Sequence, residues 1–138
     1  MGKYWLPFSP NVPVKIDPSP SHCLKAHYCI DFDVPCGTPV RAVRDGVVIF
    51  RESRFSKSYM SKRYMIRANV VVIRHTDGEE SIYAHLQWRT VRVNLGQKIK
   101  RGQIIGLSGQ TGYATYPHLH FGVYKGQKNI KIKFINRT

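Results

Sequence analysis

Short apolar runs separated by turn residues dominate the hydrophobic pattern of this chain. Residues 69–74 (NVVVIR) form a continuous β-branched run, which predicts a strand covered on both faces. A polar turn (TDGE) leads into residues 80–86 (ESIYAHL), which we expect to return as the antiparallel partner. Residues 40–50 contain two short runs on either side of Asp45-Gly46, a turn signal that predicts a hairpin.

The remainder of the chain follows the same β pattern with fewer signals. Residues 51–67 are basic and poorly periodic, and either a short helix or an excursion from the sheet accounts for them. Closely spaced glycines over residues 96–112 predict tight turns between strands. Residues 130–135 (IKIKFI) alternate and are expected to close the sheet. We therefore predict an all-β, mainly antiparallel fold with little helix.

The chain of 138 residues is long enough for one domain with a sizeable core. Prolines concentrate in its first twenty residues, which disfavours a central strand or a long helix there. We expect residues 1–22 to form an extended arm, laid over the domain because Trp5 and Phe8 would be costly to leave in water. Residues 23–138 then form the domain itself.

Two histidines stand two positions apart in an otherwise apolar run, residues 116–124 (YPHLHFGVY). Side chains alternate on a strand, so His118 and His120 share one face, roughly 6.6 Å apart at the backbone. Leu119 and Phe121 then face the core. The pair indicates a metal or catalytic site, although exposed or core-satisfied histidines would give the same pattern.

Other histidines add candidate ligands. His27 precedes Asp31 in H-Y-C-I-D, and the backbones of these two residues would be about 13 Å apart on a flat strand, so the segment must bend if both bind one ion. His85, in Y-A-H-L, is expected on a neighbouring strand. We assign His22 and His75 no chemistry. Two imidazoles and one carboxylate make a catalytic zinc site with an open position for water, and a nearby imidazole supplies a base or a hydrogen-bond donor.

Four sequence blocks, in this order, resemble those of the lysostaphin-type zinc metallopeptidases that cut bacterial peptidoglycan peptides. They are H-Y-C-I-D-F-D-V-P-C-G-T-P-V-R-A-V-R-D-G-V-V, Y-A-H-L, V-N-L-G-Q-K-I-K-R-G-Q-I-I-G-L-S-G-Q-T-G and P-H-L-H-F. The resemblance spans residues 27–124. It implies a compact, β-sandwich-like metallopeptidase fold with a groove walled by loops.

The resemblance also implies roles for the site residues. His27, Asp31 and His120 would hold one Zn²⁺ per chain. His118 and His85 would stay uncoordinated and act as general base or transition-state donors. No substrate-binding residue is identified from the sequence.

Cys29 departs from the family pattern, which usually has glycine at this position. A φ above zero there would strain a cysteine, and a thiolate facing the metal would compete as a ligand. We expect Cys29 to point away, into packing or a disulfide. The chain has three cysteines, so at most one internal bridge forms, and a Cys23–Cys36 bridge is one possibility.

Charge is the unusual bulk property, with a formal net charge of +14. Such a field attracts polyanions, including nucleic acid, anionic lipid and envelope polymers, and does not by itself choose among them. The densest basic patch lies in residues 51–67. We expect peptidoglycan peptides as substrate, anionic envelope polymers as a partner of the basic surface, no specific nucleic acid, and a monomer.

No apolar run approaches the roughly 20 residues of a membrane helix, and the first residues do not resemble a signal peptide. We expect the protein to act in the cell envelope, as a periplasmic or secreted protein. It would reach this location after removal of a leader, by another export route, or after phage-associated or other lysis.

The predicted function is a zinc endopeptidase of peptidoglycan stem or cross-bridge peptides. The alternative is a catalytically silent wall-binding or regulatory domain on the same scaffold, and a basic nucleic-acid-binding domain is a third possibility. Glycine bridges and links from D-alanine to a diamino acid both stay open as the bond that is cut.

Overall fold

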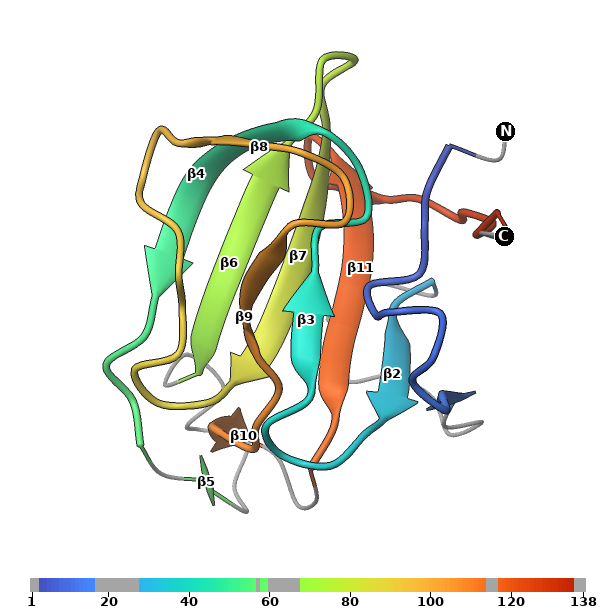
Figure 1. Cartoon of the computed structure of the whole chain (residues 1–138). Helices are drawn as coiled ribbons and strands as arrows, with labels where there is room; N and C mark the ends of the chain where they lie inside the picture. Colours follow the sequence, from blue (N-terminus) through green and yellow to red (C-terminus); the bar gives the residue numbers. More distant parts are fainter. Residues whose placement is uncertain (1–2, 17–27, 57, 60–67, 114–116, 136–138) are drawn as a thin grey trace.

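The computed structural model describes residues 3–16, 28–56, 58–59, 68–113 and 117–135 (Figure 1). Within these residues all regular structure is β-strand. The strands are β1 (Lys15–Ile16), β2 (Ile30–Asp33), β3 (Pro39–Arg41), β4 (Gly46–Glu52), β5 (Ser58–Tyr59), β6 (Asn69–Arg74), β7 (Glu79–Leu86), β8 (Lys98–Ile99), β9 (Ile104–Leu107), β10 (Gly112–Tyr113), β11 (Leu119–Lys125) and β12 (Lys128–Asn129).

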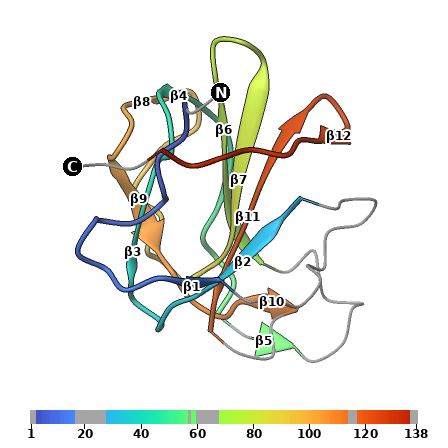
Figure 2. The same cartoon turned by 90° about the vertical axis from the view of Figure 1, so that its right-hand side faces the viewer.

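One large antiparallel sheet forms the body of the molecule. Its eight strands run in the order β1-β2-β11-β7-β6-β4-β8, and β12 pairs with β11. A second layer, the antiparallel pair β3–β9, lies across one face of this sheet, and the short parallel pair β5–β10 lies near one end of it (Figures 1 and 2). The all-β, mainly antiparallel prediction is therefore confirmed. No helix in the described part of the chain is long and apolar enough to cross a bilayer.

The hydrophobic core fills the space between the two layers. β-Branched and aromatic side chains from alternate positions of the large sheet meet Val40 and Ile105 of the β3–β9 pair, as two packed sheets require. Strand β6 alternates between buried and half-buried residues, so only one of its faces is fully covered. The prediction of a strand covered on both faces is wrong in this respect, because the second layer lies on one side of the sheet only.

The hairpin predicted over residues 40–50 does not form. Strand β3 pairs with β9 in the second layer, whereas β4 pairs with β6 and β8 in the large sheet. Gly46 is absent from the glycines with positive φ. A Cβ on Gly46 would lie 2.5 Å from the carbonyl oxygen of Arg74, so this glycine permits close strand packing instead of a turn.

The strands predicted over residues 69–74 and 80–86 form as β6 and β7. They pair antiparallel across the predicted turn. The segment 130–135 does not become a strand of the large sheet; its regular pairing is a single bridge from Phe134 to Tyr4. The helix or excursion expected within residues 51–67 falls largely outside the described residues.

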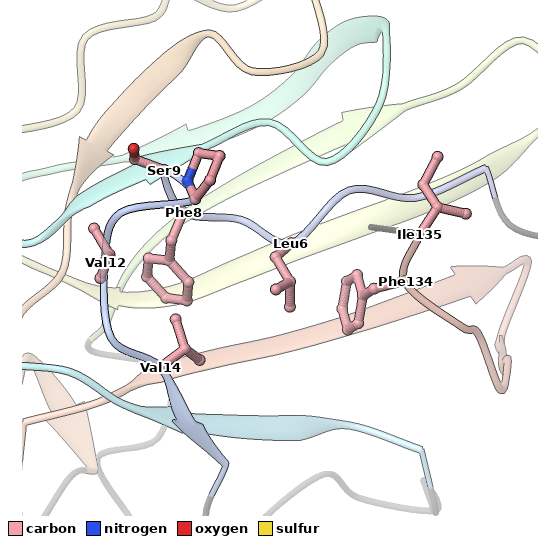
Figure 3. A pocket seen from close by; sticks show the side chains of 8 residues that line it. Leu6, Phe8, Ser9, Val12, Val14, Phe134 and Ile135 are labelled. Carbon is pink, nitrogen blue, oxygen red and sulfur yellow. The ribbon is translucent and has the colours of Figure 1, made fainter. Parts of the chain in front are cut away.

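The described residues of the N-terminal segment contribute aromatic side chains to the core. Tyr4 and Phe8 are buried in the same core as the strands, and Trp5 is half-buried. Figure 3 shows Phe8 and Val14 on one side of a cavity of about 220 Å³ and Phe134 on the other. The predicted boundary at residue 22 lies outside the described residues and stays a prediction.

Candidate metal centre

Three neighbouring strands bring the candidate side chains together at one end of the large sheet. In the register of β11, His120 stands opposite Asp31 of β2 on one side and Ala84 of β7 on the other. His118 precedes β11 and forms an isolated bridge with Gly109. Leu119 is fully buried in the core, as the alternation predicted, so His118 and His120 face the opposite side.

Asp31 and His120 form the closest pair in this cluster. The Nδ1 atom of His120 lies 2.9 Å from Oδ1 of Asp31, and Asp31 is only 4% exposed. Two donor atoms that bind one tetrahedral zinc ion at about 2.05 Å lie about 3.3 Å from each other. The pair is thus near the separation of two ligands of one zinc ion, with the nitrogen and oxygen donors that zinc accepts.

His85 reaches the cluster through a β-bulge. Asn69 pairs with Leu86 and Val70 pairs with Ala84, so His85 is the extra residue in β7. Its φ is +65°, a left-handed conformation that costs a non-glycine residue about 1–2 kcal/mol. Simple alternation would point His85 into the core and Leu86 out of it. The bulge reverses this, because Leu86 is buried in the core while His85 lies beside the other site histidines.

The tautomer of His85 follows from its hydrogen bond. Its Nδ1 lies 2.5 Å from the carbonyl oxygen of Thr111, which accepts only, so Nδ1 carries the proton and donates. Burial, reinforced by the neighbouring His118, lowers the pKa of His85 to about 3. His85 is therefore neutral at pH 7, and its Nε2 is a hydrogen-bond acceptor.

His118 lies between the other members of the cluster. Its ring centroid is 4.7 Å from that of His85, and its Nε2 is 3.8 Å from Oδ1 of Asp31. The ring centroids of His85 and His120 are 5.9 Å apart. Asp31, His85, His118 and His120 thus converge, although 89 positions separate Asp31 from His120 in the chain.

Two residues that sequence reasoning missed support the bulge. The side chain of the fully buried Asn69 donates to the carbonyl oxygens of Phe55 and Leu86. The hydroxyl of Thr111 also donates to the Leu86 carbonyl, and it accepts from the Asn69 backbone N–H. These hydrogen bonds satisfy backbone groups whose regular inter-strand hydrogen bonds are lost at the bulge. Asn69 begins the β-branched run and Thr111 lies in the third sequence block, but neither pattern indicates this role, because the partners are backbone atoms distant in the chain.

The first predicted ligand, His27, lies outside the described residues, as does His22. Among the residues that the structure describes, no group of three or more ligating side chains has metal-binding geometry. Asp31 and His120 are two of the three predicted ligands. The complete ligand set stays a prediction, because His27 lies outside the described residues.

The cysteines differ from one of the sequence expectations. Cys36 is free and exposed, so the Cys23–Cys36 bridge is wrong. Cys29 is disulfide-bonded, as one alternative held, and it is absent from the residues with positive φ. The remaining cysteine, Cys23, lies outside the described residues.

Comparisons with known proteins identify the relatives of this chain. The model of "Peptidase family M23" matches residues 25–132. The peptidoglycan DD-endopeptidase ShyC of Vibrio cholerae is 36% identical over 79% of this chain and 24% of its own length. The glycyl-glycine endopeptidase ALE-1 of Staphylococcus capitis is 42% identical over 69% of this chain and 24% of its own length. A zinc-containing peptidase from Vibrio cholerae superposes with a TM-score of 0.66 and 28% identity, covering 94% of this chain and 40% of that chain.

The chain therefore spans about a quarter of the length of the curated relatives that it matches. The matched region nonetheless includes every candidate site residue from His27 to His120. Family model, sequence identity and superposed fold agree over most of the chain, which belongs to peptidase family M23.

Proposed function

We propose that the chain is a zinc-dependent endopeptidase that hydrolyses amide bonds in peptidoglycan stem or cross-bridge peptides. The observation that carries the proposal is the convergence of Asp31 and three histidines from three strands on one buried cluster. Family membership supports the same reaction, since relatives at 36% and 42% identity are named as peptidoglycan or glycyl-glycine endopeptidases.

In this proposal His27, Asp31 and His120 hold one zinc ion per chain. The mixed nitrogen and oxygen donors and the 2.9 Å contact of Asp31 with His120 fit such a site. Bound zinc supplies a Lewis acid that lowers the pKa of a coordinated water to about 7. The remaining steps belong to side chains of the protein.

His85 is proposed to accept a proton from the attacking water. Its Nε2 is available as an acceptor because Nδ1 donates to the carbonyl of Thr111. His118 is then assigned to hydrogen-bond the oxygen on which negative charge develops during attack. Burial of both rings strengthens these interactions by excluding water.

The alternative of a catalytically silent wall-binding domain rested on Cys29. A cysteine in a disulfide is not a thiolate, so it does not compete for the open zinc position. The alternative thereby loses its sequence argument, and the endopeptidase is the function that the site supports best.

We also propose that the protein works in the cell envelope, periplasmic or secreted. The disulfide at Cys29 favours an oxidising compartment, and the net charge of +14 favours anionic envelope polymers as a long-range partner. In the described part of the basic patch, Arg54 pairs with Glu52 at 3.3 Å and Arg51 donates to the Val93 carbonyl. The other basic residues of the patch, Lys57, Lys62, Arg63 and Arg67, lie outside the described residues, so the proposal rests on the overall charge.

The test combines metal analysis with hydrolysis of purified peptidoglycan. We expect about one zinc ion per chain, release of new amines from sacculi, and loss of both in His120→Ala. A chelator should abolish hydrolysis, and added zinc should restore it. Product mass spectrometry on a wall with glycine bridges and one with direct links assigns the bond. Full hydrolysis by metal-free protein or by His120→Ala would contradict the proposal.

A further inference from the structure

Residues 108–111 contact the backbone beside both histidines that are not proposed as zinc ligands. Ser108 forms an isolated antiparallel bridge with Leu86, the last residue of β7, and Gly109 forms one with His118. The Gly109 carbonyl accepts the backbone N–H of His118 at 3.3 Å. The segment therefore joins the end of β7 to the residue that precedes β11.

Thr111, the last residue of this segment, uses its side chain and its main chain on different partners. Its buried hydroxyl donates to the carbonyl oxygen of Leu86 in β7 at 2.7 Å and accepts the backbone N–H of Asn69 in β6 at 3.1 Å. Its own carbonyl oxygen accepts Nδ1–H of His85 at 2.5 Å. The hydroxyl that ties residue 111 to two strands thus also fixes the carbonyl that holds the His85 ring.

The hydrogen bond from His85 to this carbonyl decides which ring nitrogen can accept a proton. A neutral imidazole carries its proton on either Nδ1 or Nε2, and the partner of one nitrogen sets the role of the other. A carbonyl oxygen only accepts, so its contact with Nδ1 selects the tautomer in which Nε2 is the acceptor. Without this contact, the tautomer with a proton on Nε2 is no longer excluded.

We propose that Thr111 is a positioning residue for His85. Its hydroxyl holds residue 111 against Leu86 and Asn69, and its carbonyl oxygen thereby fixes both the position of the His85 ring and the proton on Nδ1. The inference rests on the proposed function, because it assigns Thr111 a part in turnover that acts through His85.

The chain offers a matched control in Thr90, whose hydroxyl makes the same two kinds of hydrogen bond. It donates to the Gln87 carbonyl at 2.8 Å and accepts the backbone N–H of Leu107 at 3.2 Å. None of the hydrogen bonds of the Thr90 side chain in the described part of the chain reaches a histidine. Thr90→Val therefore removes similar contacts without touching the partner of His85.

The first test compares these variants on soluble cross-linked peptidoglycan fragments, well below the melting temperature of each protein. Thr111→Val keeps the shape of the side chain and removes the hydroxyl. We expect its kcat to fall about 10- to 100-fold with little change in KM, because small displacements of a catalytic group cost turnover and not binding. Thr111→Ser, which keeps the hydroxyl, and Thr90→Val should both stay near the parental kcat, and zinc content should be parental throughout.

A double-variant comparison separates positioning of His85 from general support of the fold. In a His85→Ala background, Thr111→Val should lower kcat no further, because the residue through which it acts is absent. An equal loss in both backgrounds would overturn the inference and leave Thr111 a structural role. Parental kcat in Thr111→Val, or an equal loss in Thr90→Val, would overturn it too.

A spectroscopic measurement needs neither zinc nor turnover. In protein labelled with ¹⁵N-histidine, the parent should show a proton on Nδ1 of His85, assigned by the absence of this NMR signal in His85→Ala. Thr111→Val should lose the signal or transfer part of the proton to Nε2, whereas Thr111→Ser should keep it. An unchanged Nδ1–H signal in Thr111→Val would overturn the inference. A parent that shows the signal but hydrolyses no peptidoglycan would overturn the proposed function instead, and the signal in Thr111→Val would still decide what holds His85.

Discussion

The two ends of strand β7 each bury histidine, and they use it differently. Beyond the first end, His75 is 2% exposed, and both its ring nitrogens contact oxygen atoms of the protein, the Asp45 carbonyl at 2.7 Å and the Ser81 hydroxyl at 3.0 Å. At the other end, His85 lies against two further histidines and near a carboxylate. Burial of a histidine therefore does not by itself indicate a catalytic role. The groups that contact the ring distinguish a catalytic histidine from a structural one.

The His75 end forms a buried chain of hydrogen bonds with one consistent direction. The Val43 N–H donates to the Tyr83 hydroxyl, which then donates to Ser81 at 2.8 Å. Ser81 donates to Nε2 of His75, and Nδ1–H of His75 donates to the Asp45 carbonyl. Every member is satisfied with a neutral imidazole, so we assign this chain a structural role.

The largest expected effect is a loss of activity from a substitution at the His85 end of β7. His118→Ala should lower peptidoglycan turnover about 10²–10⁴-fold, the usual contribution of a positioned proton donor or acceptor. Zinc content should stay near that of the parent, because His118 is not a proposed ligand. Steady-state hydrolysis of sacculi and metal analysis check this. Parental turnover in the variant would remove His118 from the mechanism.

The next largest expected effect is a loss of stability from a substitution at the His75 end of β7. His75→Ala should lower the free energy of unfolding by about 2–4 kcal/mol, because it leaves a cavity and deprives Ser81 and the Asp45 carbonyl of their partner. Urea denaturation measures the change. The folded variant should keep parental zinc affinity, and a loss of zinc binding would contradict a purely structural role.

The smallest effect is a pH dependence. Burial lowers the pKa of His75 from its usual 6.5, outweighing the hydrogen bond to Asp45. Between that value and the lower folded pKa, the unfolded chain binds a proton that the folded protein does not, so stability falls as pH falls. The slope for one proton is at most about 1.4 kcal/mol per pH unit.

The matched variant His75→Gln isolates this contribution. The charged groups that act on His75 are Arg44, Asp77 and Glu79. Against the opposing effect of burial, hydrogen bonds from Lys3 and Arg44 hold the pKa of Asp77 below its usual range, so Asp77 stays ionised in this window. Urea unfolding at several pH values should show a shallower loss for His75→Gln. Parallel curves for parent and variant would exclude His75 as the cause.

Several site features were predictable because they depend on local periodicity. The alternation around Leu119 assigned His118 and His120 to one face, and the β-branched run before the TDGE turn predicted β6 and its pairing with β7. The hairpin at Asp45-Gly46 failed, because the same dipeptide also serves where a glycine must admit a neighbouring strand.

The orientation of His85 was beyond sequence reasoning. Period-two alternation in β7 puts His85 in the core, and only the bulge opposite Asn69 turns it toward His118. That bulge depends on hydrogen bonds from Asn69 and Thr111, which are far apart in the chain.

The sequence by itself determined the all-β fold, the family and the candidate residues, because strand periodicity and motif spacing are properties of neighbouring positions. Only the tertiary structure decided which side chains meet. The 2.9 Å contact of Asp31 with His120, the bulge at His85 and the hydrogen bonds of Thr111 join segments from different strands. Such contacts arise when strands pair and pack, and no local pattern encodes that register.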